Sequence, residues 1–375
     1  MRIGVPMERM VEEYRVGMTP AAAHVLVSDG HEVFVERAAG QGAGFSDQEY
    51  LDAGCRVVGA GDAWDAELVV KVKQPEAEEY RYFREGMALF SYLHLAPAPA
   101  LTAAILESGM TAIGLETVQR ADGRLPLLAP MSQIAGRMAV MVGAHFLQRP
   151  HGSAGILPGG ISGVPSAQVV VVGGGTVGLG AARVAVGLGA RVVVMDTDPE
   201  RLHVLDDLFD GRVGTLIAQP LVVAAAVRDA DLVIGAVLVP GARAPHVVSA
   251  AMVRSMRSGS VIVDVAVDQG GCVETCDHVS THRAPVYERY GVLHYAVANI
   301  PGSVPRTATQ ALANATLPYL RRLAAVGWRQ AAREDPALAR GVNVADGLCA
   351  CAPVAEAQGR KWTAVSELLG GADLS

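Results

Sequence analysis

The glycine-rich segment QVVVVGGGTVGLG, residues 168–180, constrains the fold of this chain more than any other feature. The valine run before it predicts a buried strand, and the alanine-containing run after it predicts a helix that packs closely on that strand. Gly173, Gly175 and Gly178 have the spacing that turns a strand sharply into a helix whose first N–H groups can face a pyrophosphate. We therefore expect a nucleotide-binding βαβ unit here. A glycine-rich turn in an α/β protein without a ligand is the alternative.

An acidic residue at the end of the next predicted strand indicates which nucleotide binds. Asp196 follows the apolar run Arg191–Met195, at about the position of the acid that accepts hydrogen bonds from the adenosine ribose. Its negative charge would repel a 2′-phosphate, so the sequence favours NAD over NADP. Arg201, one helical turn further on, is the feature that could weaken this preference.

Strand-like and helix-like segments alternate twice along the chain, once in its first third and again after a Gly/Pro-rich passage. This pattern predicts an α/β protein with two doubly wound, Rossmann-like domains on parallel sheets. We expect a substrate domain of residues 1–130 and 300–375, because the polar helix 307–326 should return to it. Residues 131–299 should form an NAD-binding domain, and a ligand should lie in the cleft between the domains.

Local signals place several of the elements. Thr19 followed by Pro20 marks a helix start, Ser46 and Glu49 have capping-box spacing, and Glu78–Arg84 is expected to be helical. The apolar runs predict buried strands at Arg2–Val5, Glu32–Val35, Leu68–Val72, Ala88–Tyr92, Thr111–Leu115, Gln168–Val172, Arg191–Met195, Leu232–Ala236, Ser260–Val265 and Leu293–Ala298.

Composition limits the classes of function. Hydrophobic residues make up 51 % and charged residues 18 %, which argues against extensive disorder. A net charge of −7 without any basic run gives nucleic acid no general attraction. The N-terminus has no secretory pattern and the apolar stretch 138–147 is shorter than the roughly 20 residues of a membrane span, so we expect a cytoplasmic protein. Five cysteines are an odd, sparse set, typical of ordinary thiols rather than of a disulfide framework or a zinc site.

Over almost its whole length the sequence resembles the alanine dehydrogenase family. The segments that carry the resemblance, in order, are GVPMERMVEEYRVGMTP, LVVKVKQP, LFSYLHLA, LPLLAPMSQIAGRMA, GGGTVG, ADLVIGAVLVPGARAP, VDVAVDQGGCVET, HYAVANIPGSVPRTATQAL and NATLPY. The related alpha subunit of proton-translocating nicotinamide nucleotide transhydrogenase shares part of the pattern, but SYLHLA and VDQGGCVET fit the dehydrogenase better. The resemblance implies reversible, NAD-dependent deamination of a small L-amino acid, first of all L-alanine to pyruvate and ammonia, by a homohexamer.

By this resemblance, Arg15 and Lys73 hold the substrate. An arginine fork can grip a carboxylate at two points, and a lysine can stabilise negative charge on a carbonyl oxygen. Lys71 and Lys73 are expected on one face of the strand Leu68–Val72, at the end where doubly wound sheets place ligands. A surface arginine near a turn is the alternative for Arg15.

His94 and Asp268 are the catalytic candidates that accompany Lys73. His94 could take the proton that is lost when the amine becomes an imine and water attacks it. Asp268 could orient that water and stabilise the iminium charge. The alternatives are a histidine with an ordinary place in the core and a turn aspartate before a glycine pair.

The other expected contacts lie at strand ends and on one helix. Asn299 should bond near the nicotinamide or the substrate, and Met131 should pack beside the substrate methyl group. The cofactor contacts expected besides the three glycines are Ser132, Thr176, Val177, Asp196, Arg201, Val237, Leu238, Val265, Ala266, Val267, Asp268, Val297, Ala298, Asn299 and Ile300.

Some positions depart from the pattern of the family. Gln74 and Gln133 stand where glutamates are common, which could change what the substrate pocket accepts. Val326 stands where some relatives have a histidine that binds a divalent ion with an acid matching Glu116, so we expect no metal. A paralogue that dehydrogenates, cyclises or deaminates another amino acid, a transhydrogenase-type subunit and a non-catalytic NAD-binding protein remain the alternatives.

Overall fold

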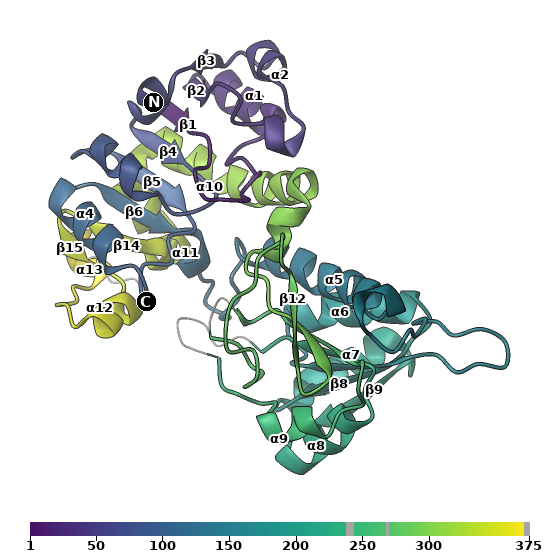
Figure 1. Cartoon of the computed structure of the whole chain (residues 1–375). Coiled ribbons are helices and arrows are strands. Elements are labelled where there is room, and N and C mark those ends of the chain that lie inside the picture. The colour runs from purple at the N-terminus through teal and green to yellow at the C-terminus, as the bar shows by residue number, and fades with distance from the viewer. Residues whose placement is uncertain (238–243, 268–269, 371–375) are drawn as a thin grey trace. The chain divides into compact units, whose positions relative to one another are not determined.

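Two mixed sheets, each with its own helices, organise the chain (Figure 1). In the computed structural model, unit 1 contains Met1–Met131 and the C-terminal segment from Val304, and unit 2 contains Ser132–Ser303. The predicted α/β class is confirmed, whereas the substrate and cofactor roles of the two segments stay predictions. The structure describes residues 1–237, 244–267 and 270–370.

The sheet of unit 2 has seven strands in the order β12-β13-β11-β10-β7-β8-β9. All neighbouring pairs are parallel except β12 with β13, so the expectation of a parallel sheet is wrong at this edge. The two residues that join these strands, Tyr290 and Gly291, both have positive φ, as tight hairpins favour. The strands are β7 Gln168–Val172, β8 Arg191–Asp196, β9 Val213–Ile217, β10 Leu232–Gly235, β11 Val261–Asp264, β12 Val286–Arg289 and β13 Val292–Tyr295.

The valine run of β7 is buried on both faces of this sheet because successive side chains of a strand point in opposite directions. Val169 and Val171 pack in one core with α5 (Ala129–Phe146), α6 (Thr176–Gly187) and α7 (Pro199–Phe209). Val170 and Val172 pack in another core with α8 (Pro220–Arg228) and α9 (Ala250–Arg254). Helices therefore cover both faces, as a doubly wound fold requires.

The sheet of unit 1 has eight strands in the order β15-β14-β6-β5-β4-β1-β2-β3. The strands from β6 to β3 are parallel. The C-terminal segment adds β14, antiparallel to β6, and β15, antiparallel to β14, so the expectation of a parallel sheet is wrong at this edge too. The strands are β1 Arg2–Val5, β2 Glu32–Glu36, β3 Arg56–Val58, β4 Leu68–Val70, β5 Ala88–Ser91, β6 Thr111–Gly114, β14 Val342–Ala345 and β15 Leu348–Cys349. Several strands end one to three residues earlier than the apolar runs predict, and the next residues keep single main-chain hydrogen bonds to the neighbouring strand, as the Lys71 N–H and the Val72 carbonyl do.

Capping residues fix the ends of the helices of unit 1. The Thr19 hydroxyl accepts from the Ala22 N–H before α1, and Ser46 with Glu49 forms the expected capping box. The stretch predicted as helical at Glu78–Arg84 is a short 3₁₀ helix, η2. The helices are α1 Pro20–Ser28, α2 Asp47–Asp52, α3 Ala60–Trp64, α4 Pro99–Ser108, α10 Pro305–Glu334, α11 Pro336–Gly341, α12 Ala352–Gln358 and α13 Val365–Leu368, with 3₁₀ helices η1 Gln41–Ala43, η2 Ala77–Tyr82 and η3 Leu115–Thr117. Unit 2 adds η4 Arg149–His151 and η6 Ile300–Ser303.

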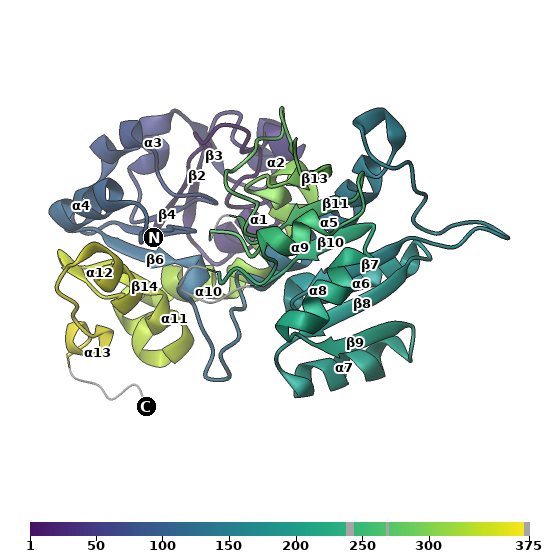
Figure 2. The ribbon, with the colours of Figure 1, turned by 60° about the horizontal axis from the view of Figure 1, so that its bottom comes forward.

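The long helix α10 lies against α1 and η1 of unit 1 (Figure 2). The Arg321 guanidinium on α10 binds the carboxylate of Asp29, which caps the end of α1, with N–O distances of 2.6 and 3.0 Å. Gly327 has φ of 75° and interrupts the helix directly after the predicted end of this segment. Within the described part of the chain, none of the helices combines the length and the apolar character that a membrane span needs.

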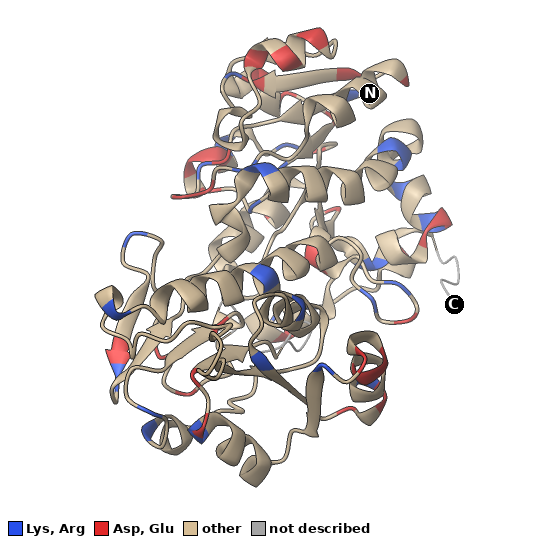
Figure 3. Ribbon diagram, turned by 90° about the vertical axis from the view of Figure 1, so that its right-hand side faces the viewer, with Lys and Arg blue, Asp and Glu red and all other residues tan. Residues whose placement is uncertain are grey.

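Charged residues of both signs are interspersed along the ribbon (Figure 3). Most of the ion pairs between them lie at the surface, where each contributes little to stability. The pairs of Glu13 with Arg15 and of Glu8 and Glu79 with Lys71 are different because both partners are buried. Glu13 and Glu8 lie beside the predicted site residues Arg15 and Lys73, whereas Glu79 contacts Lys71 away from them.

Candidate functional site

Four neighbouring parallel strands bring polar candidates to one edge of the sheet of unit 1. Arg15 lies in the connection after β1, Lys73 follows β4, His94 follows β5, and Glu116 lies in η3 after β6. Parallel strands place their carboxyl ends along a common edge, which is where ligands bind in doubly wound sheets. The predicted substrate residues Arg15 and Lys73 and the predicted catalytic residue His94 therefore share this edge, and Met131 contacts Arg15 there.

Arg15 is held by a carboxylate rather than exposed to solvent. Its Nε and Nη2 donate to the two carboxylate oxygens of Glu13 at 2.7 and 2.6 Å, and its Nη1 lies 3.1 Å from the sulfur of Met131. Burial opposes the guanidinium charge, but the hydrogen bonds and the charge of Glu13 raise the pKa of Arg15 above its ordinary value. With only 2 % of Arg15 exposed, the alternative of a surface arginine is excluded.

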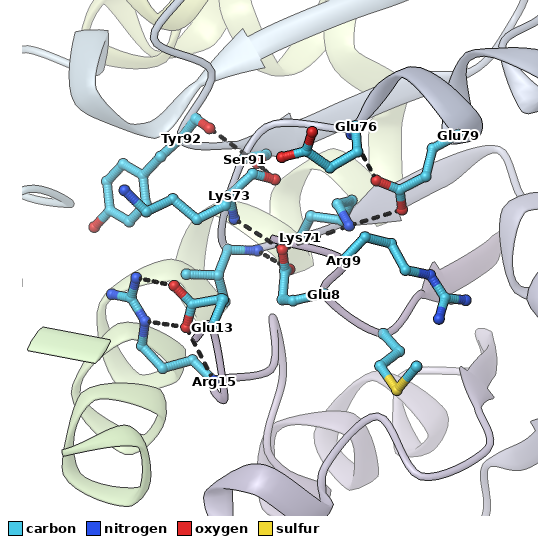
Figure 4. Close-up of polar contacts among 12 residues, drawn as sticks. Glu8, Arg9, Glu13, Arg15, Lys71, Lys73, Glu76, Glu79, Ser91 and Tyr92 are labelled. Carbon is cyan, nitrogen blue, oxygen red and sulfur yellow. Dashed lines mark hydrogen bonds and ion pairs between the residues drawn. The ribbon is translucent and has the colours of Figure 1, made fainter. Parts of the chain in front are cut away.

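The two lysines after β4 do not share a face, so that prediction is wrong. The strand ends at Val70, and beyond it the Lys71 ammonium enters the interior, 3.0 Å from a carboxylate oxygen of Glu79. The Lys73 side chain is only half-buried and extends toward Tyr92, away from that of Lys71 (Figure 4). Side chains alternate regularly between the two faces only within the strand. Beyond its end, the contacts with buried carboxylates determine the direction of the Lys71 side chain.

Two side chains that the sequence reasoning missed fix the main chain at Lys73 (Figure 4). The Glu8 carboxylate accepts hydrogen bonds from the N–H groups of Val72 at 2.6 Å and Lys73 at 3.2 Å. The Ser91 hydroxyl donates to the Lys73 carbonyl at 2.8 Å. Burial raises the pKa of Glu8, and the nearby Lys71 ammonium opposes that shift.

His94 has an unusual backbone that another carboxylate supports. Its φ is 46°, a left-handed conformation that costs a residue with a Cβ about 1–2 kcal/mol. Glu116 accepts from the His94 N–H at 2.7 Å and from the Leu93 N–H at 3.1 Å. The imidazole stacks on the Tyr92 ring with centroids 6.3 Å apart, and the Tyr92 hydroxyl donates to the Leu127 carbonyl at 2.6 Å. The conformation is therefore held from several sides.

Potential metal ligands do not cluster in the described part of the chain. No three His, Cys, Asp or Glu side chains there gather as a metal site would require. The five cysteines are buried free thiols. Gln74, which follows Lys73, has a buried side-chain oxygen that finds no hydrogen-bond partner among the described residues.

The glycine-rich turn of unit 2 joins β7 to α6 with the geometry that the sequence predicts. Gly173 has φ of 106°, and a Cβ there would lie 2.6 Å from the Ala236 carbonyl oxygen. A Cβ on Gly178 would lie 1.8 Å from the Gly173 carbonyl oxygen. Gly175, at the start of α6, is exposed, and a Cβ on it would meet nothing within 4 Å. The outer glycines serve the turn itself, whereas Gly175 leaves open space beside the helix N-terminus.

Asp196 and Arg201 both support this turn. The Asp196 carboxylate, at the end of β8, accepts from the N–H groups of Gly174 at 2.6 Å and Asp198 at 3.0 Å. The Arg201 Nε donates to the Gly174 carbonyl. The middle glycine of the GGG triplet, which the predicted spacing leaves out, thus ties the turn to the neighbouring strand and helix.

The other predicted cofactor contacts follow strands β10, β11 and β13 or begin helices. With β7 and β8, these strands form five consecutive neighbours, so their carboxyl ends share one edge of the sheet of unit 2. Val237 follows β10; Val265, Ala266 and Val267 follow β11; Val297, Ala298 and Asn299 follow β13; Ile300 begins η6; Thr176 and Val177 begin α6; Ser132 lies in the first turn of α5. Leu238 and Asp268 lie outside the described residues.

The segment after β11 is organised by a buried aspartate that sequence reasoning missed. The Asp264 carboxylate accepts from the N–H groups of Ala266, Cys272 and Val273, each at 2.9 Å. Burial raises the pKa of Asp264, and these hydrogen bonds oppose the shift. The sequence feature that could have indicated this role is the position of Asp264 at the end of an apolar strand, upstream of the Gly270–Gly271 pair.

Comparison with known proteins gives one consistent result. The model "Alanine dehydrogenase/PNT, N-terminal domain" matches residues 4–135, and "Alanine dehydrogenase/PNT, C-terminal domain" matches residues 139–351. An alanine dehydrogenase of Staphylococcus haemolyticus is 51 % identical over 370 residues, which cover 98 % of this chain and 99 % of the relative. A solved L-alanine dehydrogenase matches with a TM-score of 0.92 and 52 % identity over 95 % of this chain and 99 % of that one. A transhydrogenase from Sinorhizobium meliloti matches with a TM-score of 0.81 and 27 % identity over 94 % and 99 % of the two chains.

Replacing Glu13 by Ala should destabilise unit 1 strongly, because the buried Arg15 guanidinium would lose its bidentate carboxylate. Removing one partner of a buried ion pair costs about 3–5 kcal/mol of unfolding free energy. Glu334→Ala is the matched control, since Glu334 binds Arg322 in an exposed pair and its loss should change little. Urea denaturation followed by circular dichroism measures both variants. Equal midpoints for the two variants would contradict the structural role assigned to Glu13.

Proposed function

The chain belongs to the alanine dehydrogenase/PNT family, and from this premise we propose that it catalyses the reversible, NAD-dependent oxidative deamination of L-alanine to pyruvate and ammonia. The observation that carries the proposal is 51 % identity with a relative of that activity over nearly the whole of both chains. The transhydrogenase, at 27 % identity, is a weaker guide to the reaction. Arg15, Lys73 and His94 at adjacent strand ends supply groups that this chemistry needs.

The residues of unit 2 fit an NAD molecule. Gly175 and the N-terminus of α6 offer open space and N–H groups to a pyrophosphate. A carboxylate accepts about four hydrogen bonds, so Asp196 can bind ribose hydroxyls while it holds the Gly174 N–H. Arg201 is already bonded to the turn, which supports NAD rather than NADP. Bound NAD would accept the hydride from the substrate Cα.

The residues of unit 1 would anchor and polarise the amino acid. Glu13 holds the Nε–Nη2 edge of Arg15, so the substrate carboxylate would bind through other N–H groups of the guanidinium. Met131 lies beside the guanidinium, where it would pack against the substrate methyl group. The Lys73 ammonium would stabilise negative charge on the carbonyl oxygen of pyruvate. It would do the same for the hydroxyl oxygen of the carbinolamine that forms when water adds to the imine.

Proton transfer would be carried by residues next to the substrate carbon. The His94 imidazole would take a proton from the water that attacks the imine and return it to the departing ammonia. Asp268 stays the candidate for orienting that water, and it lies outside the described residues. Asn299, at the end of the segment after β13, would hold the nicotinamide or the substrate by hydrogen bonds.

The purified protein should therefore reduce NAD when L-alanine is added, and His94→Ala should lower kcat by about 10²–10⁴-fold, the usual contribution of a positioned acid–base group. His203→Ala, at an exposed histidine of α7, is the control and should leave the rate unchanged. NADH absorbance across a panel of L-amino acids measures this. NADH formation with a different amino acid, and none with L-alanine, would change the assigned substrate. No NADH formation with any amino acid would refute the proposal of a dehydrogenase.

NAD binding should depend on Gly178 and not on Gly187 of the same helix. A Cβ at Gly178 would collide with the Gly173 carbonyl and push α6 away from β7, whereas a Cβ at Gly187 would meet nothing within 4 Å. We expect Gly178→Ala to weaken NAD binding at least about tenfold, or about 1.4 kcal/mol, and Gly187→Ala to leave it unchanged. Isothermal titration calorimetry with NAD and NADP measures this. Equal affinities of both variants would argue against binding at this turn, and tighter binding of NADP would reverse the cofactor assignment.

We further propose that the chain assembles as the homohexamer that the resemblance implies. The segment between α5 and β7 extends from its unit (Figure 2) and contains no charged residue from 152 to 167. Leu157, Ile161 and Val164 are exposed on it, which is typical of a surface that another protein covers. Gly159 packs this segment on the end of α6, next to the exposed Leu188.

Ile161→Asp should dissociate the assembly, because a carboxylate would be buried in an apolar contact. Leu221→Asp is the control, since Leu221 is an exposed apolar residue on α8, outside this segment. Light scattering coupled to size-exclusion chromatography gives the mass of each variant. A monomeric wild-type protein, or an Ile161→Asp variant of unchanged mass, would remove this surface from the proposal.

A further inference from the structure

The segment that carries Lys73 lies just beyond the regular sheet. β1 pairs with β4 at Ile3–Leu68 and Gly4–Val69, and then β1 ends at Val5. On the other side, the Phe90 carbonyl of β5 accepts a hydrogen bond from the Lys71 N–H. The Tyr92 N–H, directly after β5, donates to the Val72 carbonyl. N–H groups alternate between the two neighbours of a strand, so the Val72 N–H points to the side that β1 has already left.

The Glu8 carboxylate supplies the acceptors that β1 no longer provides. One oxygen accepts from the Val72 N–H at 2.6 Å, and the other accepts from the Lys73 N–H at 3.2 Å. The Lys73 carbonyl is held from its other side by the Ser91 hydroxyl at 2.8 Å. Both main-chain polar groups of Lys73 are therefore fixed by side chains (Figure 4).

The Glu8 carboxylate is itself held in place. It is buried, and the Lys71 ammonium lies 3.5 Å from one of its oxygens. That ammonium also binds Glu79 at 3.0 Å and lies 5.8 Å from the centre of the Trp64 ring. Lys71 thus acts as a buried counter-ion beneath the segment, and it leaves Lys73 as the lysine that extends toward the strand edge.

We propose that Glu8 is a positioning residue for Lys73, which sets the direction of the Lys73 ammonium by clamping its main chain. The inference rests on the proposed function, in which that ammonium meets the substrate oxygen. The effect is indirect, because the Glu8 carboxylate is directed to the main chain and to Lys71. A displacement of about 1 Å at a reacting group can lower a rate about a hundredfold.

Glu79 offers a matched control for Glu8. Both glutamates are buried, and both bind the Lys71 ammonium. Glu79 accepts from the Glu76 N–H at 2.8 Å, whereas Glu8 accepts from the N–H groups of Val72 and Lys73. If both glutamates only stabilise the fold, substitutions of Glu8 and Glu79 should have similar effects on activity. If Glu8 positions Lys73, only substitutions of Glu8 should lower kcat/KM strongly.

The test compares E8Q, E8D and E79Q with the wild-type protein. E8Q keeps the length of the side chain and removes its negative charge. E8D keeps the negative charge and shortens the side chain by one methylene group. We expect both Glu8 variants to lower kcat/KM for L-alanine about 10- to 100-fold with unchanged NAD affinity, because unit 2 is intact. E79Q should lower the thermal unfolding midpoint and keep kcat/KM within about twofold of the wild type. Calorimetric binding of pyruvate to the NADH-loaded protein gives a second readout.

The outcomes separate this inference from the proposed function. A wild-type protein without amino-acid turnover refutes the proposed function and the inference with it. An active wild type whose Glu8 variants keep kcat/KM, or lose it to the same extent as E79Q at a similar unfolding midpoint, refutes the inference alone. If E8Q does not fold, E8D and E79Q still decide, because E8D retains the counter-charge to Lys71.

Discussion

The architecture of both units depends on carboxylates that accept main-chain hydrogen bonds where the chain leaves the sheet. Glu8 does so after β4, Glu116 after β5, Asp196 at the end of β8 and Asp264 at the end of β11. At these points the N–H groups lose their strand partners, and an unpaired buried N–H costs about as much as a lost hydrogen bond. A carboxylate can satisfy several of them at once, so the irregular segments that bear the proposed site residues keep one conformation.

These carboxylates are retained against an electrostatic cost. Burial raises the pKa of Glu8 and of Asp264, which shows that desolvation disfavours their charged forms. Hydrogen bonds to a charged group contribute about 1.5–3 kcal/mol each, so two or three such bonds offset a penalty of several kcal/mol. Glu8 gains further from Lys71, whereas Asp264 accepts from three N–H groups and from the Cys272 thiol. The result is rigidity at the strand edge rather than a large gain in stability.

The fold could be predicted from the sequence further than the site could. The valine run of β7 and the glycine spacing after it are local signals, and local geometry decides their outcome. The hairpins β12–β13 and β14–β15 were missed, although Tyr290–Gly291 and Asp346–Gly347 are short turn signals between apolar strands. The direction of Lys71 depends on Glu79 and on Glu8, and Glu8 is more than sixty residues away in the sequence, so no local pattern contains that information.

Under the proposed function, the reaction depends on side chains at the strand edges and not on the fold that carries them. The transhydrogenase and the alanine dehydrogenase of known structure both superpose on most of this chain, so the arrangement of strands does not choose between them. What can choose is the set of side chains at the carboxyl ends of β1, β4 and β5, together with the groups that hold them. Arg15 is oriented by Glu13, Lys73 by Glu8 and Ser91, and His94 by Glu116. If these residues bind the substrate as proposed, we expect a change of specificity within this fold to involve the supporting carboxylates as well as the residues that touch the substrate.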